Sequence, residues 1–144
     1  LAKRMGMDVP DQDDLEDIAR AGSGSARDMK AILTAYRDTA YTNKSGTRYL
    51  NMALEWSGYT RDGLTELSRK YLIALLVQCR GKAGLATIAS VMGEPGPLGH
   101  VEQSLLRLGY IGIEPGGRVI TPAGNWLMMS MLAVTPSASA TRTP

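Results

Sequence analysis

The sequence predicts a mainly α-helical protein of two small domains, with one β-hairpin in the second domain. Three observations predict this fold class. Apolar residues recur every three or four positions through most of the chain, which is the period of an amphipathic helix. A polar stretch with two glycines, residues 57–63, divides the chain where the charge balance changes sign. Residues 110–121 depart from the helical period around a Pro-Gly-Gly turn, as is typical of a hairpin.

The composition limits the possible functions. The 144 residues are 44% hydrophobic and carry a net charge of only +2, with the basic excess in residues 63–144. A polyanion would therefore favour the second half. Cys79 is the single cysteine and His100 the single histidine, so neither an internal disulfide nor a structural zinc site is expected. No apolar run suffices for a membrane span and no signal-peptide core is present, so we expect a cytoplasmic protein.

The first half is expected to contain three or four short helices. Acidic residues open a helix at about residue 13, where they complement its dipole, and Gly22 and Gly24 end it. Ser25 can cap a second helix that continues to about Tyr41. After a polar loop at residues 42–46, Thr47 can cap a further helix with Leu50, Ala53 and Leu54 on one face.

The second half begins with an apolar helix that Thr65 caps and Gly81 closes. A short helix at about 85–92, a helix at about 98–108, a hairpin and a last helix at about 122–132 follow. This order predicts a winged-helix domain, which is a helix-turn-helix followed by a β-ribbon. Residues 135–144 are rich in Ser, Thr and Pro, and we expect a disordered tail there.

The sequence offers no catalytic constellation. Gly81 and Lys82 lack the spacing of a phosphate loop. Cys79 lies in the apolar stripe of its helix, where a thiol usually acts as a small hydrophobe. We find no catalytic triad, metal cluster or carboxylate pair, so this segment alone is not expected to be an enzyme.

Arg27 is a candidate anion-binding residue. It falls in the first turn of its helix, directly after a Gly-Ser-Gly-Ser turn, where its charge opposes the helix dipole. A helix N-terminus with an arginine is suited to phosphate oxygens. The alternative is a solvated arginine that pairs with Asp28 or another acid.

Four residues of the second half are candidates for DNA contact. Arg118 lies on the second strand of the hairpin beside two glycines, and a wing arginine commonly binds a phosphate or enters a minor groove. His100, Gln103 and Arg107 lie on the expected recognition helix and can reach base edges. For His100, a solvated polar residue with no DNA contact is the alternative.

A collinear series of short motifs resembles the RuvB family, the AAA+ motors of bacterial Holliday-junction branch migration. The resemblance extends from about Leu15 to Thr121. It is carried by these segments in order: Asp17-Ile18-Ala19-Arg20, Gly24-Ser25-Ala26-Arg27, Tyr36-Arg37-Asp38, Gly63-Leu64, Arg69-Lys70-Tyr71-Leu72, Gly81-Lys82-Ala83-Gly84-Leu85-Ala86-Thr87-Ile88-Ala89, Met92-Gly93-Glu94, Glu102-Gln103-Ser104-Leu105-Leu106, Gly109-Tyr110 and Pro115-Gly116-Gly117-Arg118-Val119.

The resemblance implies that residues 1–60 are the small helical lid of an AAA+ ATPase and that residues 63–134 are its winged-helix DNA-binding domain. A large domain before Leu1 would then carry the Walker motifs and bind most of the ATP and Mg²⁺. The segment that ends in Arg27 resembles the family's sensor-2 motif Gly-Thr-Pro-Arg, which implies that Arg27 reaches the nucleotide phosphates. A homo-hexamer acting on duplex or junction DNA, with a junction-binding partner protein, is also implied.

The wing departs from the family pattern. Residues 113–118 correspond to Arg-Thr-Pro-Arg-Gly-Arg, and of the three arginines only Arg118 is present, because Ile113 and Gly116 replace the others. Each lost phosphate contact removes about 0.9 from the salt slope of duplex binding, so weaker and less salt-sensitive binding is expected.

Three functional hypotheses follow. The first is the lid and DNA-binding part of an ATP-dependent DNA motor, a helicase or translocase. The second is a stand-alone winged-helix regulator that reads duplex sequence with His100, Gln103 and Arg107. The third is an interaction adaptor that recruits a partner through the last helix, which is rich in methionine.

Overall fold

The computed structural model describes residues 1–6, 10–42 and 49–140, and the chain divides into two compact units. The first unit is Leu1–Glu66, and the second begins at Leu67. The sequence placed the boundary earlier, in the polar stretch that contains Gly58 and Gly63. The structure anchors that stretch to the first unit, because Tyr59 packs against its core and Arg61 donates a hydrogen bond to Asp17.

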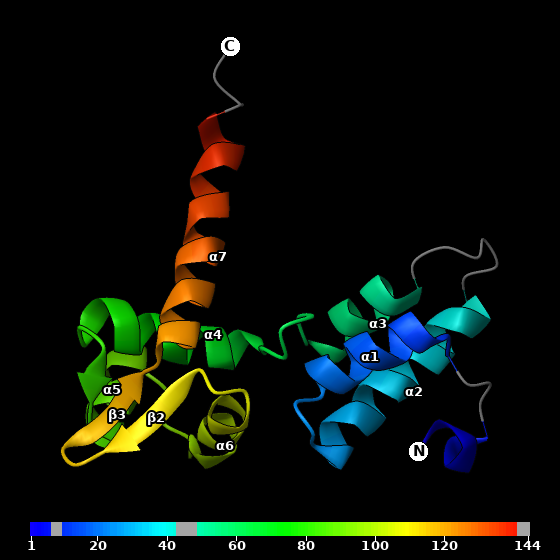
Figure 1. The fold of residues 1–144 in the computed structure, drawn as a ribbon, viewed down its shortest axis with the longest axis horizontal. Coiled ribbons are helices and arrows are strands. Elements are labelled where there is room, and N and C mark those ends of the chain that lie inside the picture. Colours follow the sequence, from blue (N-terminus) through cyan, green and yellow to red (C-terminus); the bar gives the residue numbers. More distant parts are fainter. Residues whose placement is uncertain (7–9, 43–48, 141–144) are drawn as a thin grey trace. The chain divides into compact units, whose positions relative to one another are not determined.

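The first unit consists of short helices around an apolar core (Figure 1). Their bounds are η1 Ala2–Met5, α1 Gln12–Ala21, α2 Ala26–Thr42 and α3 Tyr49–Ser57. The predicted cap of α2 is present, since Ser25 Oγ accepts a hydrogen bond from the Asp28 amide at 3.4 Å. Thr47, the predicted cap of α3, lies outside the described residues. The buried core residues are Ala2, Ile18, Ala21, Ile32, Leu33, Leu50 and Leu54.

The second unit has the predicted order of helices followed by a hairpin. Its elements are α4 Glu66–Ile73, a π-helix η2 Ala74–Gln78, β1 Lys82–Ala83, α5 Leu85–Met92, α6 Gly99–Arg107, β2 Ile111–Glu114, β3 Gly117–Ile120 and α7 Pro122–Ala140. The fold is therefore mainly α-helical with a small antiparallel sheet, and the predicted winged-helix arrangement is confirmed. In this arrangement α6 is the recognition helix and β2 with β3 is the wing.

The sheet has three strands in the order β1-β3-β2, so β3 is central. The wing closes with a two-residue tip, Pro115 and Gly116, because Glu114 pairs with Gly117. Gly117 has a φ of 146°, and a Cβ at this position would lie 2.5 Å from the Ala83 carbonyl oxygen. Only glycine therefore allows the start of β3 to lie this close to the end of β1.

Two predicted segments differ in the structure. The helix that Thr65 precedes was expected to continue regularly to Cys79, but at Ala74 it widens into a π-turn, where the Cys79 amide donates to the Ala74 carbonyl at 2.9 Å. The tail was expected to be disordered from residue 135, but α7 continues to Ala140. Extending a formed helix costs less than nucleating one, although Pro136 removes one backbone donor from this extension. Residues 141–144 lie outside the described residues.

Candidate nucleic-acid interface

The recognition helix α6 separates its residues onto two faces. His100, Gln103 and Arg107 follow one another at spacings of three and four, so they share one face, and all three are exposed. The opposite face is buried and carries Val101, Glu102, Ser104 and Leu105. Arg107 also donates to Ser104 Oγ at 3.3 Å, which holds its side chain along the helix. The structure thus brings together three of the four predicted DNA-contacting residues on an accessible polar face.

Arg118, the fourth predicted residue, is turned toward the buried face of α6. Its Nε lies 2.6 Å from Glu102 Oε1, and its Nη2 lies 3.2 Å from Oε2, so the pair is bidentate. The Arg118 side chain is 25% exposed, and Glu102 is only 7% exposed. The hydrogen bond to Glu102 raises the pKa of Arg118 above its ordinary value. The guanidinium is therefore already engaged inside the domain.

Tyr71 completes this cluster from α4. Its hydroxyl donates to Glu102 Oε1 at 2.8 Å, and the tyrosine is fully buried. Burial, followed by the hydrogen bond to Glu102, raises the pKa of Tyr71. Sequence reasoning missed both Tyr71 and Glu102 as partners of Arg118. For Glu102 the sequence did offer a signal. Glu102 lies one helical turn from the apolar residues Leu98 and Leu105, so its spacing places it on the buried face of α6.

The three-stranded sheet presents a different cation to solvent. Lys82 on β1 is about half exposed and lies 3.3 Å from the Glu114 carboxylate, which is itself exposed. Ile113 on β2 is 61% exposed, and the tip residues Pro115 and Gly116 are exposed as well. Exposed ion pairs of this kind contribute little to stability, so Lys82 can exchange Glu114 for another anion.

Arg27 lies at the entrance to α2 in the first unit. The preceding turn contains Ser23 and Gly24, with φ values of 48° and 75°, and Arg27 is exposed in the first helical turn. Asp28, its neighbour, is 3% exposed and accepts a hydrogen bond from the Tyr59 hydroxyl. Asp28 is thus held inside the unit, whereas Arg27 is exposed.

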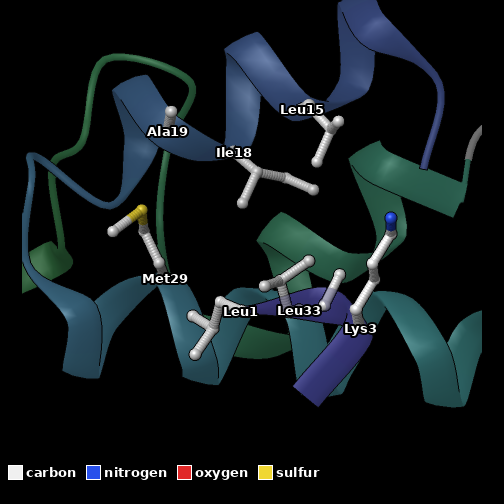
Figure 2. Close-up of a pocket in the computed structure, with 8 residues that line it drawn as sticks. Leu1, Lys3, Leu15, Ile18, Ala19, Met29 and Leu33 are labelled. Carbon is white, nitrogen blue, oxygen red and sulfur yellow. The ribbon is translucent and has the colours of Figure 1, made fainter. Parts of the chain in front are cut away.

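The other features of the described residues concern metal ligation, membrane spans, a thiol and a cavity. The described residues contain no group of three or more His, Cys, Asp or Glu side chains that could hold a metal ion. None of the helices, as far as they are described, is long and apolar enough to cross a membrane. Cys79 is a half-buried free thiol. A cavity of about 350 Å³ in the first unit has an apolar lining, which Figure 2 shows coming from the N-terminal segment, α1 and α2.

Helix α7 exposes part of its apolar surface. Leu127 and Met128 are buried in the second unit, but Trp126, Met129 and Leu132 are 71%, 58% and 41% exposed. The helix contains no charged residue between Pro122 and Ala140. In Figure 1, the later turns of α7 extend away from the sheet of this unit.

Two comparisons with known proteins agree with these observations. Residues 61–129 match the family described as the RuvB C-terminal winged helix domain. Among solved structures, the chain is similar to the RuvB Holliday junction branch migration motor of Thermotoga maritima, with 24% sequence identity and a TM-score of 0.75 over 89% of this chain and 45% of that chain. Two mutants of that protein are 25% identical, with TM-scores of 0.76 and 0.77 over 89% of this chain and 44% of each of theirs.

The predicted resemblance to RuvB is therefore confirmed. The family match covers the winged-helix part, and the structural similarity extends over most of the chain. This chain spans less than half the length of the solved RuvB structures that it matches.

Proposed function

We propose that this chain is the nucleotide-sensing and DNA-binding part of a RuvB-like, ATP-dependent DNA motor that acts on duplex or junction DNA. The observation that carries the proposal is the accessible polar face of α6 within a winged-helix domain similar to that of RuvB. The first unit would act as the lid of the ATPase, and the second would contact DNA. Hydrolysis itself would occur on a separate ATPase domain.

In this proposal His100, Gln103 and Arg107 contact DNA directly. A recognition helix places its exposed face in the major groove, and these three side chains occupy that face of α6. Arg107 can bind a phosphate or a guanine edge, whereas Gln103 and His100 can hydrogen-bond to base edges. Lys82 on β1, the strand beside the wing, supplies a further exposed cation.

Arg27 is proposed to sense the nucleotide. Its exposed guanidinium at the N-terminus of a long helix suits phosphate oxygens. Bound ATP supplies the phosphoryl group and Mg²⁺ neutralises part of its charge, and both would be held mainly by the ATPase domain. Arg27 would then link the presence of phosphate to the position of the lid. The proposal further includes a homo-hexamer, a junction-binding partner protein and a cytoplasmic location.

A DNA titration tests the proposal. We expect this chain to bind a four-way junction and two unrelated duplexes at low salt. Arg107→Gln should lower the affinity on all of them and reduce the salt slope by about 0.9, because roughly one phosphate contact is lost. Arg4→Gln makes the same charge change in the first unit and should have no effect. Failure of the wild-type chain to bind any of these DNAs would refute the proposal.

The same titration separates the motor from a stand-alone regulator. A regulator would prefer one duplex, and His100→Ala or Gln103→Ala would cost about 1–3 kcal/mol on that duplex and much less on others. Equal losses on unrelated sequences would support the motor.

A second candidate is an interaction adaptor. The observation that favours it is the exposed apolar side of α7, formed by Trp126, Met129 and Leu132. Apolar surface of this kind is typical of a contact with another protein. If α7 serves only such a contact, Met129→Ser should leave every DNA affinity unchanged.

A further inference from the structure

We propose that Arg118 is a positioning residue that fixes the wing against the recognition helix, and that it acts on DNA through Glu102 and Tyr71 rather than by binding phosphate. The three side chains, here called the wing bracket, join β3, α6 and α4. The inference deepens the proposed function and rests on it, since it concerns how the second unit presents its wing to DNA.

The wing bracket is a closed hydrogen-bonded cluster. Glu102 accepts from Arg118 Nε at 2.6 Å, from Arg118 Nη2 at 3.2 Å and from the Tyr71 hydroxyl at 2.8 Å. Glu102 is 7% exposed and Tyr71 is fully buried, so two of the three members are shielded from water. Charge-assisted hydrogen bonds are strong in such surroundings, and the bidentate pair fixes orientation as well as distance.

A phosphate that bound Nε and Nη2 of Arg118 would have to displace Glu102. Both Nε and Nη2 face the carboxylate, so a phosphate that took them over would leave a buried Glu102 without its cation. An uncompensated buried carboxylate is strongly destabilising, whereas a single exposed phosphate contact contributes little favourable free energy. The Nε and Nη2 donors of Arg118 therefore stay on Glu102 when DNA binds.

The bracket acts on the whole sheet because β3 is its central strand. Arg118 pairs in register with Ala83 of β1 on one side and with Ile113 of β2 on the other. Elsewhere the wing is held at its base, where the Thr121 amide donates to the Tyr110 carbonyl at 3.0 Å and the Tyr110 amide to Leu105 at 3.0 Å. Arg118 adds an attachment halfway along the wing, which fixes its angle to α6.

The two possible roles of Arg118 predict opposite changes in DNA affinity for the variant Glu102→Gln. If Arg118 binds phosphate, Glu102→Gln removes a competing negative charge, and DNA binding should become tighter. If the wing bracket positions the wing, the same variant should weaken binding on every DNA. Arg118→Lys separates the roles again, because lysine keeps the positive charge but lacks the planar, bidentate fork.

The experiment measures affinity and salt slope for the full chain on one duplex and one junction. We expect Arg118→Lys and Glu102→Gln each to weaken binding on the order of tenfold, because a wing that is no longer fixed must be ordered when DNA binds, although it then makes the same phosphate contacts. The salt slope should stay at the wild-type value in Arg118→Lys. Lys82→Gln is the matched comparison, since loss of an exposed cation from the neighbouring strand β1 should lower the slope by about 0.9.

Tyr71→Phe keeps both charges and the aromatic ring, so it decides the question if the other variants fail to fold. It should weaken DNA binding without changing the salt slope. Unchanged affinity in Tyr71→Phe and Arg118→Lys, or tighter binding in Glu102→Gln, overturns the inference and leaves the proposed function standing. A wild-type chain that binds neither DNA overturns both.

Discussion

Arg61 is tied to Asp17 across 44 residues of sequence, which holds the segment after α3 against α1. The Arg61 guanidinium donates to the Asp17 carboxylate, and its Nη2 also donates to Asn51 Oδ1 at 2.7 Å. The polar stretch that the sequence marked as an open boundary is therefore fastened to the first unit by a side chain of its own.

We expect this contact to control cleavage by trypsin after Arg61. Asp17→Asn should speed cleavage there about two- to fivefold, because an exposed ion pair contributes about 0.5–1 kcal/mol and cleavage follows the opened population. Asp38→Asn removes an exposed acid that pairs with Arg37 in the same unit and serves as the control. Equal cleavage rates in the wild type and in Asp17→Asn would show that Asp17 does not hold the segment.

The order of elements could be predicted from sequence because it depends on local patterns. The helix at about 85–92 has the predicted bounds, since glycines stand directly before and after it. The strand β1 could not be predicted in this way, because two residues are too few to show a period of two. The π-turn at Ala74 continues an unbroken apolar pattern, so the sequence carries no local signal for it.

In the candidate site, too, only the features that depend on a local sequence pattern could be predicted. His100, Gln103 and Arg107 could be placed together because their spacing sets a shared helix face. The partner of Arg118 could not be found from spacing, since Glu102 lies 16 residues away and Tyr71 a further 31 residues from Glu102. The environment of Arg118 is set by its tertiary contact with Glu102, and no local sequence motif indicates this contact.

If the first unit is the proposed lid, loss of the Arg27 guanidinium should reduce ATP turnover without unfolding this unit. In a protein that joins this chain to its ATPase domain, we expect Arg27→Ala to lower turnover by at least about tenfold, because a positioned cation stabilises charge during phosphoryl transfer. The free energy of unfolding of this chain should change by less than about 0.5 kcal/mol, since Arg27 is exposed. Lys30→Ala removes an exposed cation from the same helix and should leave turnover unchanged. Normal turnover in Arg27→Ala would exclude the sensor role.

Tyr59 should make the first unit sensitive to alkali. Burial, followed by the hydrogen bond to Asp28, raises the pKa of Tyr59 to about 12. Because the folded state has the higher pKa, the stability from the neutral hydroxyl is complete below pH 10, the ordinary pKa, and is lost as the pH rises through about 12. At neutral pH, Tyr59→Phe should lower the free energy of unfolding by about 1 kcal/mol, through loss of this hydrogen bond.

Denaturant unfolding of both proteins between pH 8 and pH 12 checks this expectation. The difference in unfolding free energy between the wild type and Tyr59→Phe should shrink over the upper part of that range. A difference that stays constant up to pH 12 would show that the Tyr59 hydroxyl ionises no later in the folded state than in the unfolded one.

Gly124 should tolerate no side chain, because the first turn of α7 lies directly against the start of the wing. A Cβ on Gly124 would be 2.2 Å from the Tyr110 carbonyl oxygen and 3.1 Å from the Ile120 side chain. The oxygen belongs to backbone that already accepts the Thr121 amide at 3.0 Å, so it cannot move without breaking that hydrogen bond. We therefore expect Gly124→Ala to lower the free energy of unfolding by about 1–3 kcal/mol, the usual cost of overpacking. Gly99→Ala is the matched control at the first turn of α6, where a Cβ meets nothing within 4 Å and alanine favours the helix. Thermal and urea unfolding of both variants measures the contrast, and a Gly124→Ala protein as stable as Gly99→Ala would mean that α7 does not pack on the wing in this way.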